Sequence, residues 1–504
     1  MKKNNFRSLS FFIFLIFLNS FGSELFYIPF EHYSYRYIEK LASVGLINLE
    51  KINKKPYTYE QVKKWTSQAI DKINKGEFKI TTSGNDIEQC LLRLKKDFLD
   101  EKKVNVDINV DSLWTNLDVE KLNIPNYNGV DIYDGLNLKG KFGYSYSDKN
   151  ISFSISPVIF HNKKEDDLYL ESGYINYLFK NFLISIGRNE MWFGAGYHGS
   201  LIFSNNSFPL DRIMVENNEP FYFPWIFEKL GPSHYTFFIS MLDKNNEKYP
   251  YPFITGHRLE VNPKSYLSFG LNYKLILAGE GKRKDIYPWN YLRIFLGRSE
   301  DVWGSEKFIS NGEISWDFKW AILNLDKYLK FLGQWMEIYG EFGREVSTHT
   351  FYGWINSPEG VLFGIYLPSV FNIDGLDLRV EYADTYWKKY KDFWYVSGGY
   401  PSYYKGDVIG HHIGPDANDI YFEISKRLTD NLEVAFNYDR ENRYKSKEWV
   451  EERDYFGLNF NYIPYESNIS LNFGLNYIKI ENVNNEMSKK RDNFILGVKI
   501  NYKF

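Results

Sequence analysis

The chain ends with the stretch Asn493-Phe494-Ile495-Leu496-Gly497-Val498-Lys499-Ile500-Asn501-Tyr502-Lys503-Phe504. Every second residue from Phe494 to Phe504 is apolar, and the positions between them are polar or glycine except for Ile495. Successive side chains of a strand point to opposite faces, so this pattern predicts a strand with one apolar and one polar face. Such a strand is typical of the last strand of an outer-membrane β-barrel, where one face meets lipid and the other a polar lumen. The alternative is the edge strand of a soluble β-sandwich, and the rest of the chain must decide.

The same period of two begins at Val104 and recurs to the C-terminus. About 400 residues with this alternation favour a single closed sheet over a sandwich. Twelve strands are predicted from about residue 233 onward, with long and short connections broadly alternating. Five more are predicted between residues 104 and 191, and an even total requires one further strand within 195–232. We therefore predict an all-β transmembrane barrel of about 18 antiparallel strands, with 16 as the alternative, spanning residues 104–504.

The composition excludes several classes of protein. The formal net charge of −3 argues against a nucleic-acid partner, and the mean hydropathy of −0.43 excludes a helical-bundle membrane protein. Aromatic residues make up 19% of the chain, more than a soluble core requires. Aromatic girdles at both surfaces of a membrane would use this many rings.

The N-terminus has the features of a secretory signal. Lys2, Lys3 and Arg7 precede an apolar run from Leu9 to Leu18, which is too short to span a bilayer. Cleavage after Gly22 is expected, so residues 1–22 are predicted to be a signal peptide. An exported barrel that ends in phenylalanine implies the outer membrane of a diderm bacterium, with its lipid and its barrel assembly machinery as partners.

Residues 23–103 are predicted to form a small α-helical domain at the periplasmic side, where it plugs the barrel. Apolar residues recur there at helical spacing, and Thr58-Tyr59-Glu60-Gln61 forms a capping box. Cys90, the only cysteine, is predicted to be a small core residue and cannot form an intramolecular disulfide.

A glycine-rich stretch interrupts the strand pattern. It reads Gly187-Arg188-Asn189-Glu190-Met191-Trp192-Phe193-Gly194-Ala195-Gly196-Tyr197-His198-Gly199-Ser200-Leu201 and continues through Ser204-Asn205-Asn206-Ser207-Phe208-Pro209. This stretch resembles the Wzi-type capsule assembly proteins, whose barrels carry a similar strand-end G-R, W-G-x-G, G-S-L and S-N-x-x-x-P run. Residues 256–263 and 404–417 resemble the same family, although this chain has Phe193 inserted into the W-G pair. The motif residues are Arg188, Trp192, Gly194, Gly196, His198, Gly199, Ser204 and Asn205.

The resemblance implies an outer-membrane lectin that holds surface polysaccharide at the cell exterior. The polymer is capsule, exopolysaccharide or lipopolysaccharide, which the sequence does not distinguish. The resemblance also implies a protein that is not an enzyme, and we expect a monomer without a cofactor.

Two predicted outer loops have the chemistry of a site for an acidic polymer, because aromatic rings stack on sugars and cations pair with carboxylates. The alternative for both is a belt of interfacial aromatic residues beside solvated charges. The candidates in the loop at 385–405 are Tyr386, Trp387, Lys388, Lys389, Lys391, Trp394, Tyr403, Tyr404 and Lys405. The candidates in the loop at 279–310 are Arg283, Trp289 and Arg293.

Other polar residues are given structural interpretations. His411, His412 and Asp416 suggest a metal site, but adjacent histidines on an extended segment point apart and further ligands are lacking at a convincing spacing. We therefore expect no metal site, and no catalytic motif is found. The charged residues expected to face the lumen as a paired network are Arg188, Glu190, Arg258, Glu337, Glu341, Arg379 and Glu381.

Two other functions remain open. A porin or solute channel differs from a polysaccharide-binding protein in having an open lumen, and bilayer conductance separates the two. An outer-membrane hydrolase is disfavoured because the sequence lacks a nucleophile–base pattern.

Overall fold

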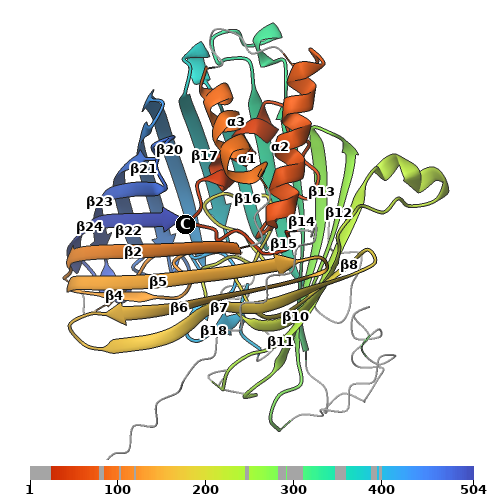
Figure 1. Ribbon diagram of the computed structural model, residues 1–504. Coiled ribbons are helices and arrows are strands. Elements are labelled where there is room, and N and C mark those ends of the chain that lie inside the picture. The colour runs from red at the N-terminus through yellow and green to blue at the C-terminus, as the bar shows by residue number, and fades with distance from the viewer. Residues whose placement is uncertain are drawn as a thin grey trace, which may run out of the picture.

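The barrel predicted from the sequence is present in the computed structural model, in which one closed antiparallel sheet contains 18 strands (Figure 1). β10 (Asp211–Asn217) supplies the strand expected within 195–232. The described residues are 24–78, 85–100, 104–118, 121–244, 249–281, 291, 310–346, 359–386, 394–396 and 400–503. The predicted signal peptide and Phe504 lie outside them.

The other barrel strands are β2 (Val104–Asn116), β5 (Gly135–Asp148), β6 (Ile151–His161), β7 (Asp166–Phe179), β8 (Phe182–Arg188), β11 (Ser233–Met241), β12 (Phe253–Lys264), β13 (Leu267–Leu277), β14 (Ser310–Ile322), β15 (Met336–Val346), β16 (Gly360–Leu367), β17 (Leu376–Asp384), β20 (Ala417–Thr429), β21 (Leu432–Arg443), β22 (Glu451–Tyr462), β23 (Ile469–Glu481) and β24 (Lys490–Lys503). The barrel closes where β2 pairs with β24, from Asp107 opposite Lys503 to Asn116 opposite Phe494. Closure leaves the sheet without a free edge, which an open sandwich would have.

The last strand has the two faces that its sequence predicts. Phe494, Val498 and Ile500 are 52%, 38% and 40% exposed on the outer face. On the inner face, Asn493 and Ile495 are buried. Ile495, the exception in the alternating pattern, packs in an apolar cluster with residues such as Ile478 of the neighbouring strand. The outer apolar band therefore arises from strict alternation, and the inner face accepts an apolar side chain where the bore is packed.

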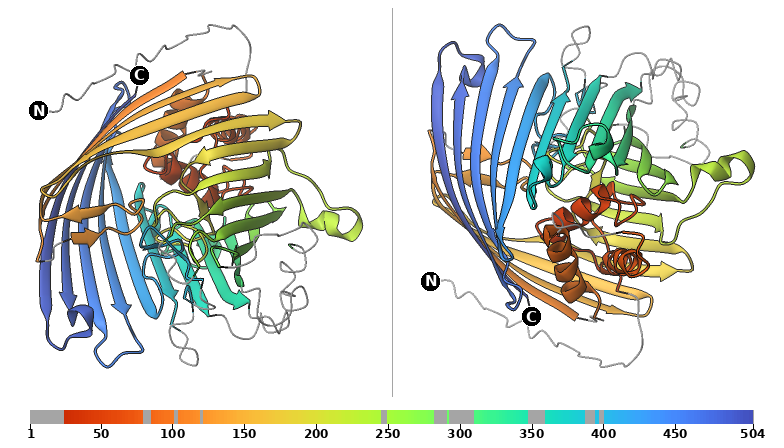
Figure 2. Two further views of the ribbon diagram at one scale, coloured as in Figure 1. Left: turned by 90° about the horizontal axis from the view of Figure 1, so that it is seen from below. Right: turned by 90° about the horizontal axis from the view of Figure 1, so that it is seen from above.

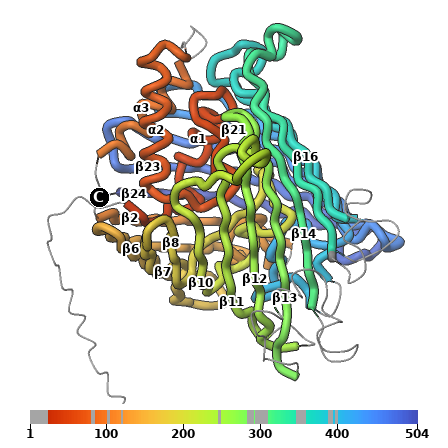
Figure 3. Tube along the Cα trace, turned by 90° about the vertical axis from the view of Figure 1, so that its right-hand side faces the viewer, coloured from red at the N-terminus to blue at the C-terminus, as the bar shows by residue number. Residues whose placement is uncertain are grey.

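Three helices cover the end of the barrel where the turns between strands are short (Figures 1 and 3). They are α1 (Ser34–Ser43), α2 (Tyr59–Asn74) and α3 (Asn85–Phe98). The Thr58 side chain accepts a hydrogen bond from the backbone N–H of Gln61, as in the predicted capping box, and Cys90 is buried in the helical core. No helix in the described part of the chain is long and apolar enough to cross a membrane.

The helices are joined to the barrel through its turns. The backbone N–H of Leu49 donates to Ser265 O at 2.8 Å, and Arg93 Nη2 donates to Asp430 O at 2.6 Å. Viewed along the barrel, the helices lie within the outline of the strands (Figure 2, right). We call this end the helix end and the opposite end, which carries the long connections, the loop end.

Two further segments lie inside the bore (Figure 2). The first follows β8 and spans residues 189–210, and the second lies between β17 and β20 and includes residues 400–416. Leu201, Phe203 and Ile413 from these segments share one buried apolar cluster with Tyr339 and Leu362 of the barrel wall. Short strand pairs occur in the connections: β1 (Lys54–Lys55) with β9 (Trp192–Phe193), β3 (Lys121–Asn123) with β4 (Asp131–Tyr133), and β18 (Tyr403–Tyr404) with β19 (Asp407–Val408).

Candidate functional site

A buried carboxylate on β15 holds the glycine-rich segment in the bore. Glu341 accepts hydrogen bonds from the backbone N–H groups of Gly196 and Leu201, both at 2.8 Å, and from the Ser200 hydroxyl at 3.2 Å. Gly194 has φ +147°, and a Cβ there would lie 2.1 Å from Glu341 Oε1. Glycine is required at this position because the backbone approaches the carboxylate so closely.

A second carboxylate, Glu381 on β17, binds the next turn of the same segment. It accepts three consecutive backbone N–H groups, from Tyr197 at 2.7 Å, His198 at 3.0 Å and Gly199 at 3.2 Å. The Tyr339 hydroxyl donates to it at 2.8 Å. Successive N–H groups that converge on one anion form a concave binding site, here occupied by the barrel's own side chain.

The remaining motif residues also hold segments together. Trp192 is buried in β9, which pairs with β1 of the N-terminal region. The Ser204 hydroxyl donates to Gly410 O at 2.6 Å, and Asn205 Nδ2 donates to Asn126 O at 2.9 Å. The motif is therefore the part of the chain that organises the interior of the bore.

Most of the charged residues expected in the lumen are there. Arg258 Nη1 lies 2.7 Å from Asp317 Oδ2, and Arg379 Nη2 lies 3.4 Å from Glu39 of α1. The expectation for Arg188 is wrong. By alternation along β8 it shares the outward face of Ile186, which is 55% exposed, and it pairs with Asp211 at the loop end.

Five candidates of the loop at 385–405 lie among the described residues, and two of them are aromatic side chains that the structure buries. Trp394 is 1% exposed and its ring packs beside Gly343, so it does not present a face to solvent. Tyr404 is 6% exposed, Tyr386 and Tyr403 are partly buried, and Lys405 is exposed. The buried rings of the described loop residues lie inward because they gain more from the apolar cluster of the bore than from water. The candidates outside the described residues are Trp387, Lys388, Lys389, Lys391, Arg283, Trp289 and Arg293.

One group of residues at the loop end brings the glycine-rich stretch 187–209 into contact with the stretch 404–417. Lys405 Nζ lies 3.6 Å from the centre of the Phe208 ring, and Arg188 Cζ lies 5.0 Å from it. Burial and the neighbouring Arg188 lower the pKa of Lys405. We call Arg188, Phe208, Tyr404 and Lys405 the rim cluster; no local pattern predicts that both cations lie near Phe208.

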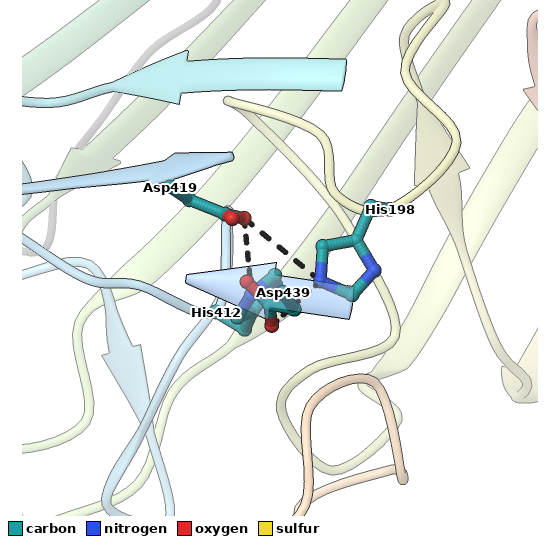
Figure 4. A group of neighbouring side chains, drawn as sticks. All are labelled: His198, His412, Asp419 and Asp439. Carbon is teal, nitrogen blue, oxygen red and sulfur yellow. Dashed lines mark hydrogen bonds and ion pairs between the residues drawn. The ribbon is translucent and has the colours of Figure 1, made fainter. Parts of the chain in front are cut away.

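A second group lies deeper in the bore, where His198, His412, Asp419 and Asp439 converge (Figure 4). Their ligand atoms all lie within 4.8 Å of one another. His198 Nε2 is 3.1 Å from Asp439 Oδ2, and its ring stacks on Tyr421 with centroids 4.0 Å apart. Burial lowers the pKa of His412. Burial alone would also lower the pKa of His198, but the negative charge of Asp439 outweighs this effect and raises the pKa.

The expectation that adjacent histidines point apart is wrong. The rings of His411 and His412 have centroids 4.5 Å apart and an interplanar angle of 31°, because the segment turns rather than running extended. Asp416 is not part of this group and instead accepts hydrogen bonds from Ser446. Of the residues that converge with His412, Asp419 is seven residues away, whereas His198 and Asp439 come from segments remote in sequence, so local spacing could not identify the group.

A cavity of about 810 Å³ lies between the helices and the wall formed by β2 and β22–β24. Amide side chains are prominent in its lining, which includes Arg36, Asn105, Asp107, Asn459, Asn472 and Asn501. The cavity is on the helix side of the two bore segments.

Comparisons with known proteins match this architecture. A family model described as capsule assembly protein Wzi matches residues 120–494. The chain is similar to the solved structure of Wzi from Escherichia coli, described as an outer-membrane protein involved in group 1 capsule assembly and a carbohydrate-binding β-barrel. The two share 18% identity with a TM-score of 0.69, over 93% of this chain and 98% of that one. OprD from Pseudomonas aeruginosa matches with a TM-score of 0.45 and 9% identity, over 80% of this chain and 95% of that one. No curated protein matches the sequence.

Proposed function

The chain belongs to the Wzi capsule assembly family, and from this premise we propose that it is a non-enzymatic protein that holds surface polysaccharide at the cell exterior. It is an outer-membrane β-barrel. The observation that carries the proposal is the occupied bore, because the helices and the two inner segments fill the space that a porin leaves open. The loop end then remains as the face on which a long polymer can be held.

The contacts of the bore segments support a permanent filling. Glu341 and Glu381 together accept five backbone N–H groups from residues 196–201, and both carboxylates are buried. A segment held by charge-assisted hydrogen bonds from two strands is expected to stay in place, whereas a gate needs contacts that break easily. This favours the polysaccharide-binding function over the alternative of a solute channel.

The rim cluster is the proposed contact for the polymer among the described residues. Lys405 is exposed, whereas Phe208 and Tyr404 are buried, so the cluster offers a sugar its cation rather than a ring face. A cation of this kind suits a sugar that carries a carboxylate, because it can pair with the acid. The side chains of Asp211 and Asp243 lie beside the cluster and oppose very acidic ligands. We also propose that the helix end faces the periplasm, that outer-membrane lipid surrounds the barrel, and that the protein is a monomer.

The test is binding of the refolded mature chain to uronate-containing polysaccharides on an array. Lys405→Ala is expected to weaken binding about fivefold at low ionic strength, which corresponds to about 1 kcal/mol for an exposed charge. The loss shrinks at about 0.2 M salt because screening acts over roughly 8 Å there. Lys489→Ala is the matched control, since Lys489 is also a loop-end lysine and its one ion pair among the described residues is with Glu486.

The outcomes separate the site from the function. If the wild-type chain binds and Lys405→Ala binds equally well, the rim cluster is not the contact and the loops outside the described residues take its place. If the wild-type chain binds none of the polysaccharides and conducts ions in large, stable steps, the channel alternative replaces the proposed function.

A further inference from the structure

We propose that His198, His412, Asp419 and Asp439 form a binding site for one divalent transition-metal ion of the zinc type, which ties both bore segments to the barrel wall. This inference does not depend on the proposed polysaccharide. It begins with the origin of the four residues. His198 comes from the first bore segment, His412 from the second, Asp419 from β20 and Asp439 from β21.

The distances between the side chains suit a four-coordinate ion. Zinc bonds of about 2.0–2.1 Å in a tetrahedron place neighbouring ligand atoms about 3.4 Å apart. His198 Nε2 lies 3.1 Å from Asp439 Oδ2 and 3.8 Å from Asp419 Oδ2. His412 Nε2 lies 3.5 Å from Asp419 Oδ2. These values bracket the tetrahedral spacing, so small side-chain shifts would complete the geometry.

The buried polar atoms at this point lack adequate partners. Among the described residues, neither ring nitrogen of His412 makes a well-aligned hydrogen bond, and Oδ1 of Asp419 and Oδ1 of Asp439 have no hydrogen-bond partner. All three residues are at most 5% exposed. A buried polar group without a partner is costly, and an ion would satisfy several at once.

The charges around the site favour a cation. Among the described residues, no lysine or arginine forms an ion pair with Asp419 or Asp439, whereas the adjacent Glu441 is neutralised by Arg443 at 2.6 Å. Two neighbouring carboxylates away from water repel each other unless a proton or a cation lies between them. A divalent ion would neutralise the pair, and the ligand set of two imidazoles and two carboxylates suits zinc and its neighbours in the first transition row.

The surroundings hold the ligands in position. The backbone N–H of His198 donates to Glu381 at 3.0 Å, while its ring stacks on Tyr421. Glu441 Oε1 lies 3.3 Å from His412 Nε2, the nitrogen assigned to the ion, so this carboxylate is placed to add a fifth ligand. Outer contacts of this kind fix the direction of metal ligands. The site would therefore act as a structural cross-link between the two bore segments and the wall strands β20 and β21.

The experiment uses the tag-free, refolded mature chain. After treatment with a chelator and dialysis, the protein is loaded with ZnCl₂ or CoCl₂, and bound metal is measured by mass spectrometry and visible absorption. One equivalent of zinc and the intense visible bands of tetrahedral Co²⁺ are expected. His198→Ala and Asp439→Asn should each lower zinc affinity by about tenfold to a hundredfold. Asp439→Asn preserves the shape of the side chain.

The matched control is His234→Ala. His234 is a buried histidine 2.9 Å from a carboxylate of Glu50, at a different place in the barrel, and this variant should retain one equivalent of zinc. The folded state of each variant is checked by its heat-modifiable migration on gels. Failure of the folded wild-type chain to retain zinc or to give tetrahedral Co²⁺ bands overturns the proposal without any variant. Unchanged affinity in both folded ligand variants overturns it as well.

Discussion

At the level of single residues, Gly194 and Gly199 of the motif segment are explained by the side chains that face them. A Cβ at Gly199 would lie 2.2 Å from the His411 ring, and one at Gly194 would lie 2.1 Å from Glu341 Oε1. The backbone must pass close to these groups so that its N–H donors can reach Glu341 and Glu381. The motif is thus a requirement for close packing inside the bore.

Gly194→Ala is expected to destabilise the barrel by about 2–4 kcal/mol, because the new Cβ overlaps Glu341 and the positive φ is strained for alanine. The measurement is the urea midpoint of the refolded protein, read by heat-modifiable migration. Gly140→Ala on β5 is the control, since its nearest atom lies 4.0 Å from the new Cβ. Equal urea midpoints for the two variants would show that the segment accommodates the new Cβ without loss of stability.

At the scale of secondary-structure elements, charges join the helices to the barrel. Glu39 of α1 lies 2.5 Å from Lys55 and 3.4 Å from Arg379. Burial by itself raises the pKa of Glu39, but the charges of Lys55, Lys319 and Arg379 prevail and lower it from 4.5 to about 2. Asp97 of α3 also has a pKa lowered to about 2: burial raises it, but the charge of Lys503 and the hydrogen bond from Tyr33 outweigh that effect.

These shifts predict that acid loosens the helices. A carboxylate with a depressed pKa in the folded state contributes stability above its unfolded pKa, and this stability is lost as the pH falls through the folded value. For Glu39 the window runs from about 4.5 down to about 2, and the contribution at neutral pH is roughly 3 kcal/mol. Opening of the helical region should therefore become more frequent across this range.

Cys90 provides the measurement, because it is the only cysteine and is buried among the helices. Its reaction with dithiodipyridine, which modifies thiols even at acid pH, is expected to be slow at pH 7 and faster as the pH falls toward 2. In Glu39→Gln the thiol should react faster at pH 7 and depend less on pH. Equal protection at pH 7 and pH 2 would contradict the prediction.

At the scale of the whole molecule, the bore is closed in two layers. The helices cover one end, and the two inner segments cross the bore toward the loop end (Figures 1 and 2). The cavity of about 810 Å³ lies on the helix side of these segments. The full chain should therefore show no large, stable conductance steps in planar bilayers.

Deletion of residues 24–102 is expected to leave a barrel that folds and to raise its ion conductance, because the deletion opens the cavity to solvent. The increase should remain below that of an open 18-strand pore, since Glu341 and Glu381 still hold the first inner segment. Conductance is measured on both proteins after identical refolding, with heat-modifiable migration as the control for folding. Identical conductance would mean that the helices do not limit passage.

The barrel and the helical segment before it were predictable from the sequence alone, and the strand count was predictable as about 18 with 16 as the alternative. These properties follow from how often apolar residues recur along the chain. They recur every two residues in a strand that shows one face to lipid, and about every 3.6 residues in a helix that buries one stripe. The alternation at Phe494 and Ile500 is therefore visible without a structure, as is the capping box at Thr58. The motif segment could also be located from its glycines, although its contacts could not.

Which residues meet inside the barrel could be read only from the folded chain. His198 and Asp439 are distant in sequence and become neighbours because the sheet closes around the inner segments. Trp394 is buried rather than exposed for the same reason, and Arg188 meets Lys405 across Phe208. Side-chain periodicity fixes the face of a strand on which a residue lies, but closure and packing of the bore fix its partners.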